Sequence, residues 1–203
     1  MKKILRRIVI CGLFAACCWS FFLLSDKKQL RDGLIRFHVV AHSDNKEDQA
    51  IKEVVRDAVL RSIQEDLQKI TDIQQAKKYL LNNLPKIQQI VRQTLNDLNF
   101  QKNASVTLCR ETFAVRHYDT FSLPAGVYDS LRIVIGDGLG KNWWCVSFPT
   151  LCIPATTTGF ADAAVEAGFS DTLVQTITGN KGYEIRFFFL DQLGKLENIL
   201  FQG

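Results

Sequence analysis

The sequence has 203 residues, of which 47% are hydrophobic, enough for one folded domain with a sizeable core and a targeting segment. Its formal net charge of +4 comes from basic residues within the first seven positions, because the other 21 basic residues balance the 21 acidic ones. Nucleic-acid-binding proteins carry a clustered basic surface, so this neutral body argues against that class of function.

The N-terminal segment has the composition of an export signal. Its basic residues precede a run of 17 uncharged residues from Ile8 to Leu24, which is the order found in secretory signals. As a helix this run would be roughly 25 Å long, marginal for a hydrocarbon layer of about 30 Å. We therefore expect residues 1–25 to be a signal peptide or an N-terminal membrane anchor, with the basic end in the cytoplasm. Residues 26–33 would be a linker to a single extracytoplasmic domain at 34–196.

The first part of this domain predicts one strand followed by helices. Leu34 to Ala41 is rich in β-branched and aromatic residues, which favour strands. Apolar residues then recur at helical spacing between Lys46 and Leu98. Asp44 and Thr71 are each followed three residues later by Glu or Gln, a pattern that starts helices. Pro85 suits the first turn of a further helix, so we expect three helices here.

The second part predicts mainly strands. Ala104 to Val115 alternates in polarity with a period of two, which is typical of a strand. Leu131 to Ile135 and Trp143 to Phe148 are apolar runs on either side of the glycine-rich segment Gly136 to Asn142. This order predicts a β-hairpin. For Glu184 to Leu196 we favour a helix, with a strand as the alternative.

Helices that are separated along the chain from most strands favour an α+β fold over a parallel wound sheet. We expect a mixed or antiparallel sheet of about four strands with a central β-hairpin, and about three helices over one face. The tail at 197–203 partly resembles a cut viral-protease tag site. It can be a native end or a tag remnant, so we predict no secondary structure from it.

The cysteines permit at most one disulfide in the exported domain. Three of the six lie in the N-terminal apolar run, and Cys109, Cys145 and Cys152 remain. Cys145 and Cys152 are close in sequence and are therefore the candidate pair. The alternative is that all three are buried thiols.

The histidines suggest a metal site only weakly. His38 and His42 are four residues apart in a predicted strand, so they would face the same side, and Asp44 follows them. These side chains are suitable zinc ligands. However, Asp44 is expected to cap a helix and His38 to lie in the core. The glycines between Gly136 and Gly140 lack the spacing of a phosphate-binding loop.

Nucleophilic catalysis would need a Cys or Ser beside a His base. Cys145 with His38 or His117 is one arrangement, and Ser122 with His117 and Asp119 is another. Neither nucleophile lies in a motif such as G-x-S-x-G. We therefore assign no catalytic, cofactor-binding or metal-binding residue.

The two adjacent tryptophans are the strongest candidates for partner binding. Neighbouring residues of a strand point to opposite faces of the sheet, and a single core cannot easily bury both rings. Tryptophan is also a common anchor of protein interfaces. We expect one tryptophan in the core and the other on a partner-binding surface, together with the turn before the hairpin. The candidate residues are Trp143, Trp144, Pro124, Ala125, Gly126 and Tyr128.

Three segments of the chain resemble the stage II sporulation protein R family of endospore-forming bacteria. They are Ile35–Leu60, Leu123–Cys152 and Glu184–Leu196, and together they cover most of the expected domain. The stretch GLGKNWWCVSFPTLC within the second segment is the most specific part. His42 departs from the resemblance, which leads us to expect Asn there, and this weakens a metal site further.

The resemblance implies a signalling protein rather than an enzyme. Such a protein is exported from the forespore into the space between the two sporangial membranes. There it activates a membrane-embedded aspartic protease of the mother cell, stage II sporulation protein GA, which then processes pro-sigma-E. The implied partner is this protease, and the N-terminal segment would add membrane contact if it is not cleaved.

Two other classes of function are alternatives. One is an extracytoplasmic envelope hydrolase that uses Cys145 or the face carrying His38 and His42. The other is a passive structural module of the envelope. A hydrolase should lose activity when these side chains are replaced, whereas a signalling ligand should tolerate the change at Cys145 if it still folds.

Overall fold

The computed structural model describes residues 2–118, 120–148, 159–179 and 184–202. The helices are α1 (Lys2–Gly33), α2 (Lys46–Leu67), α3 (Ile73–Asp97), α4 (Gly159–Glu166), α5 (Asp171–Ile177) and α6 (Glu184–Gln202). The strands are β1 (Ile35–Val40), β2 (Ala104–Phe113), β3 (Arg116–His117), β4 (Ser122–Leu123), β5 (Gly126–Ile135) and β6 (Asn142–Phe148). This combination of helices with a mixed sheet confirms the predicted α+β class.

The main sheet has four strands in the order β2-β5-β1-β6. Strand β1 runs parallel to β5 and antiparallel to β6, and β2 is antiparallel to β5. The strands β5 and β6 are therefore consecutive in the chain but separated by β1 in space. The predicted hairpin between them is wrong. Each of the four strands overlaps the predicted segment, but β5 begins at Gly126 rather than at Leu131.

The loop between β5 and β6 explains this difference, because it crosses the end of β1 instead of reversing beside β5. Gly140 N donates a hydrogen bond to Ala41 O at 3.0 Å, just beyond β1. A Cβ atom on Gly140 would lie 2.2 Å from the carbonyl oxygen of Ser43. Gly136 and Gly138 have φ angles of 58° and 65°, which glycine adopts without strain. The glycines that suggested a hairpin turn thus allow the loop to cross the end of β1.

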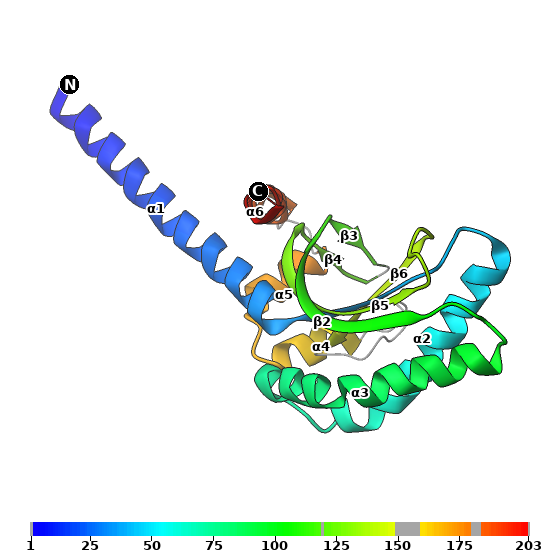
Figure 1. The fold of residues 1–203 in the computed structure, drawn as a ribbon. Coiled ribbons are helices and arrows are strands. Elements are labelled where there is room, and N and C mark those ends of the chain that lie inside the picture. The colour runs from blue at the N-terminus through cyan, green and yellow to red at the C-terminus, as the bar shows by residue number, and fades with distance from the viewer. Residues whose placement is uncertain (1, 119, 149–158, 180–183, 203) are drawn as a thin grey trace.

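Two helices, α2 and α3, cover one face of the sheet (Figure 1). The prediction of three helices is wrong, because Pro85 lies inside α3. Its ring is on the exposed side of the helix, and the buried stripe from Ala76 to Leu95 continues past it. Burial of this stripe stabilises α3 by more than the loss of the backbone hydrogen bond that proline cannot donate.

Both N-cap residues lie one position later than the sequence pattern indicated. The N-cap of α2 is Asn45, whose side chain accepts a hydrogen bond from Asp48 N at 2.7 Å, rather than Asp44. The N-cap of α3 is Asp72, which accepts from Gln75 N at 2.8 Å, rather than Thr71. Asp and Asn are among the best N-cap residues, so Asn45 and Asp72 can satisfy the free backbone N–H groups at the starts of α2 and α3.

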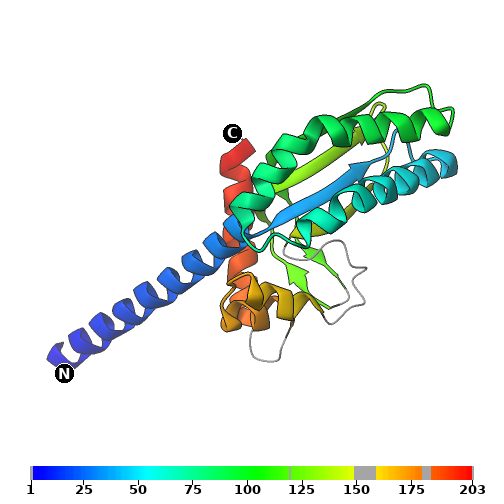
Figure 2. The ribbon, with the colours of Figure 1, turned by 90° about the horizontal axis from the view of Figure 1, so that it is seen from below.

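A second apolar core fills the opposite face of the sheet. It is built from the end of α1, the small β3–β4 sheet, and the helices α4, α5 and α6. Helix α6, predicted from sequence, crosses this side of the domain (Figure 2). It packs so closely that a Cβ atom on Gly194 would lie 1.5 Å from the carbonyl oxygen of Ala125. The side chains of this core come mainly from the C-terminal part of the chain.

Residues 26–33, which we expected to form a linker, belong to the last part of α1. Asp26 is buried and forms an ion pair with Arg186 of α6, with Nε and Oδ2 2.6 Å apart. Leu30 lies in the second core. The earlier part of α1 projects from the domain (Figure 1). Helix α1 has the length and apolarity of a membrane span, a test that a signal sequence near the N-terminus also passes.

We predict that Gly140→Ala destabilises the domain by about 1–3 kcal/mol, because the new methyl group must displace the Ser43 backbone. Chemical denaturation of the purified protein measures this change. Leu139→Ala is the matched control, since the Leu139 side chain is 79% exposed in the same loop. Equal stability of the two variants would contradict the crossing loop.

Candidate partner-binding site at the edge of the sheet

The strand β6 forms one edge of the main sheet and carries both tryptophans. Trp143 and Trp144 point to opposite faces, as predicted, since they pack against different cores. Each ring is half-buried. The expectation of one core and one surface tryptophan is therefore wrong, because the domain has a core on each side of the sheet.

Trp143 belongs to the face covered by α2 and α3. Its ring meets Phe37 of β1 edge-on, with centroids 5.8 Å apart. The guanidinium of Arg56 on α2 lies 4.9 Å from the centre of the Trp143 ring. A cation over an indole face is favourable, so Arg56 holds the partly exposed ring in place.

Trp144 lies on the other face and stacks on His38 of β1. The two ring centroids are 4.5 Å apart and the rings are almost parallel. Phe113 meets Trp144 edge-on at 5.2 Å, and the Arg116 guanidinium lies 4.9 Å from the indole centre. Trp144 is thus fixed by a histidine, a phenylalanine and an exposed arginine.

A hydrogen bond fixes the histidine beneath Trp144. His38 Nε2 and Glu111 Oε1 are 2.7 Å apart, and His38 is buried. Burial alone would raise the pKa of Glu111, but the hydrogen bond from His38 and the charges of His38 and Arg132 outweigh it. The pKa of Glu111 is therefore lower than its usual value of 4.5. The ionised carboxylate is the form that orients the His38 ring.

Arg36 is a fully buried cation next to this pair. Its guanidinium lies 4.0 Å from the centre of the Phe113 ring, and Nη2 donates to the Tyr118 hydroxyl at 3.2 Å. Among the described residues, Nε and Nη1 have no hydrogen-bond acceptor. Burial also raises the pKa of the nearby Tyr128, so its hydroxyl stays neutral. In the part of the chain that the structure describes, aromatic faces rather than a carboxylate lie against the Arg36 guanidinium.

Arg36 and Glu111 were not predicted as residues of this site. The sequence did contain a signal for Arg36. Arg36 and His38 alternate with apolar residues in a predicted strand whose other residues are apolar enough to be fully buried. Two polar side chains separated by two positions share a face. Glu111 lies in a strand of mixed polarity, and its pairing with His38 depends on the strand order, which the sequence pattern did not predict.

The turn before β5 is buried, contrary to the exposed position that we expected. Ala125 N donates to Asp191 Oδ1 of α6 at 2.9 Å, and the Tyr128 hydroxyl donates to Pro124 O at 2.8 Å. Pro124, Ala125, Gly126 and Tyr128 all lie in the interior. A role for these four residues in partner binding stays a prediction, and they are not part of the β6 edge.

The structure separates the groups proposed for a hydrolase. Cys145 packs in the core on the α2–α3 side, whereas His38 lies on the opposite face of the sheet. His117 Nδ1 and Ser122 Oγ are 2.8 Å apart on the exposed β3–β4 hairpin. Asp119, the third member of that arrangement, lies outside the described residues, and so does Cys152. The proposed Cys145–Cys152 disulfide therefore stays a prediction.

The candidate metal ligands have separate partners. His42 follows β1 and accepts a hydrogen bond from Asp137 N at 3.0 Å, while His38 bonds Glu111. Asp44 accepts from Lys141 N at 2.6 Å. Within the described part of the chain, no group of three or more His, Cys, Asp or Glu side chains is placed to hold a metal ion.

We predict that Glu111→Gln lowers stability at neutral pH and makes it less sensitive to acid. A carboxylate whose pKa is depressed by folding stabilises the protein above its unfolded pKa, near 4.5, and loses this effect as the pH falls through the folded pKa. The difference between the parent and the variant should shrink as the pH is lowered below 4.5. Denaturation curves across this range measure it, and a constant difference would contradict the pairing.

Comparison with known proteins identifies the family. The family model described as stage II sporulation protein R matches residues 31–158. The stage II sporulation protein R of Bacillus subtilis (strain 168) is 29% identical over 183 residues, covering 81% of this chain and 82% of that protein. No solved structure matches the chain. The matched region contains β1, α2, α3 and the β6 edge, and the chain belongs to the stage II sporulation protein R family.

Proposed function

We propose that this protein is an intercellular signal of sporulation that is exported from the forespore. Its partner is the membrane-embedded aspartic protease of the mother cell, stage II sporulation protein GA. Binding activates the protease, which then processes pro-sigma-E. Membership of the stage II sporulation protein R family is the observation that carries this proposal.

Two features of the molecule support it. The basic residues before the apolar run of α1 have the order of an export signal, so the folded domain would lie outside the cytoplasm. The β6 edge offers two tryptophans with a cation beside each ring. Aromatic rings and arginine are the side chains that most often dominate protein interfaces.

We assign the contact with the protease to the first half of β6. Asn142, Trp143 and Trp144 are half-buried, whereas the rest of the strand is buried. An edge strand also has backbone groups that can pair with a strand of another protein. Activation then requires that this edge binds the active form of the protease more tightly than the inactive form.

The hydrolase alternative has weaker support from the geometry. Its nucleophile, Cys145, and its base, His38, lie on opposite faces of the sheet. The His117–Ser122 pair is on an exposed hairpin, where water would compete for any substrate. The aromatic edge is the better candidate for function.

The test is co-expression of the full chain with the protease and pro-sigma-E in a host that lacks all three. Processing should depend on the chain. In the Trp144→Ala variant, the amount of chain needed for half-maximal processing should rise at least roughly 30-fold, since a desolvated tryptophan contributes about 2 kcal/mol or more to binding. Immunoblots of both proteins across an inducer series measure this shift.

Folding and binding are separated by two further variants. Leu81→Ala removes an exposed apolar side chain on α3 and should leave processing unchanged. Trp144→Phe keeps an aromatic ring against His38, so it should retain stability and recover part of the signal. If Trp144→Ala and Leu81→Ala trigger equal processing at equal amounts of folded chain, the β6 edge is not the contact.

A further inference from the structure

The helix α6 has an apolar stripe that faces away from the domain. Its members recur at intervals of three, four and seven residues, which places them on one side of a helix. Leu200 is 82% exposed and Ile185 is 66% exposed. The exposed residues of the stripe are Ile185, Phe188, Phe189, Leu196, Ile199 and Leu200.

The side of α6 that contacts the domain carries much of its polarity. Asp191 accepts from Ala125 N, and Asn198 Nδ2 donates to Phe113 O at 2.8 Å. Glu197 pairs with Lys27 of α1 at 3.2 Å. A helix on the surface of a protein in water normally has the reverse arrangement, with its apolar side inward. The outward-facing apolar stripe of α6 is therefore suited to an apolar environment rather than to water.

The position of α6 next to α1 indicates what this apolar environment is. Arg186 binds Asp26, and Lys27 Nζ donates to Leu193 O at 2.9 Å, so α6 contacts α1 directly after its apolar run. Helix α6 lies crosswise to α1, on the side of the domain from which α1 projects (Figure 1). Helix α6 therefore lies at the point where the apolar run of α1 ends.

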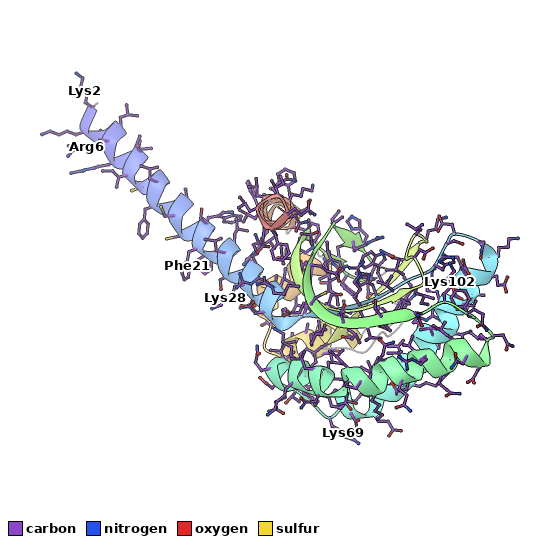
Figure 3. The ribbon with its side chains drawn as sticks, in the orientation of Figure 1. Lys2, Arg6, Phe21, Lys28, Lys69 and Lys102 are labelled. Carbon is purple, nitrogen blue, oxygen red and sulfur yellow. The ribbon has the colours of Figure 1, made fainter. Side chains whose placement is uncertain are left out.

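Charged side chains mark both ends of the apolar part of α1. Figure 3 shows Lys2 and Arg6 at the free end of the helix, Phe21 along it and Lys28 close to the domain. A bilayer around this part of α1 would have its surface near Lys28, because lysine remains at the polar boundary. That level is where α6 crosses.

We propose that α6 is an interfacial helix, whose apolar stripe enters the surface of the bilayer that α1 enters. A helix of this kind lies in the membrane plane with its apolar side chains between the headgroups and the acyl chains. Ile185, Phe188 and Phe189 carry the inference independently of the tail at 197–203. The ion pairs between α1 and α6 fix the orientation of the domain on the membrane.

The test places a tryptophan on the stripe of the full chain. The Phe188→Trp variant is reconstituted into phospholipid vesicles, with and without lipids brominated near the headgroup end of the acyl chains. The matched control is Leu139→Trp, on an exposed loop of the same tethered domain. Trp19, Trp143 and Trp144 contribute the same background to both variants.

The emission added by Phe188→Trp should be quenched by brominated lipid at least about twofold, whereas that added by Leu139→Trp should not change. Leu196→Trp repeats the measurement on the second half of α6. If neither stripe variant is quenched more than Leu139→Trp, the inference is overturned, and the stripe would then be a surface for binding a protein partner. These vesicles contain only lipid and this chain, so failure here leaves protease activation untouched.

Discussion

The position of β1 between β5 and β6 is the constraint on which the rest of the domain depends. All six residues of β1 are buried, and β5 and β6 each pair with one side of it. Phe37 and Val39 face the core under α2 and α3, while Arg36 and His38 face the second core. The loop from β5 to β6 must pass over the end of β1, which is possible because Gly140 lies against the Ser43 backbone without a side chain.

Local patterns in the sequence predicted most elements but not their neighbours in space. Periodicity indicated β2, whereas composition and apolar runs indicated β1, β6, α6 and the second half of β5, because buried elements need apolar side chains. The β5–β6 hairpin was wrong because glycines permit several loop conformations, and only the pairing with β1 selects one. Pro85 was read as a helix start, yet burial on either side of it keeps α3 continuous. Burial of the turn at Pro124 likewise depends on where α6 packs.

The candidate site was predicted in part. The opposite directions of Trp143 and Trp144 follow from strand geometry alone. The second core, the Arg36 cation between aromatic rings and the His38–Glu111 bond all require contacts between distant segments. The result is an edge strand whose rings are held by neighbouring side chains. Helix α6 forms hydrogen bonds with Ala125, just before β5, and with Phe113 of β2. These contacts lie toward the β2 edge of the sheet, so α6 does not cover the β6 edge.

Under the two proposals above, the domain has a tethering side and a contacting edge. Ion pairs join α1 to α6, and the tryptophans occupy the strand farthest from β2 in the sheet order. In the proposed arrangement the chain is tethered to the forespore membrane and the protease lies in the facing mother-cell membrane, so confinement between the two membranes raises the effective concentration of the ligand.

Site-specific photo-crosslinking in vesicles that contain the protease tests the assigned contact most directly. A photoreactive residue replaces Asn142 at the β6 edge, or Leu81 on the exposed side of α3 as the reference position. The proposed arrangement predicts a covalent adduct with the protease from position 142 and none from position 81. An adduct from position 81 alone, or equal yields from both positions, would contradict it.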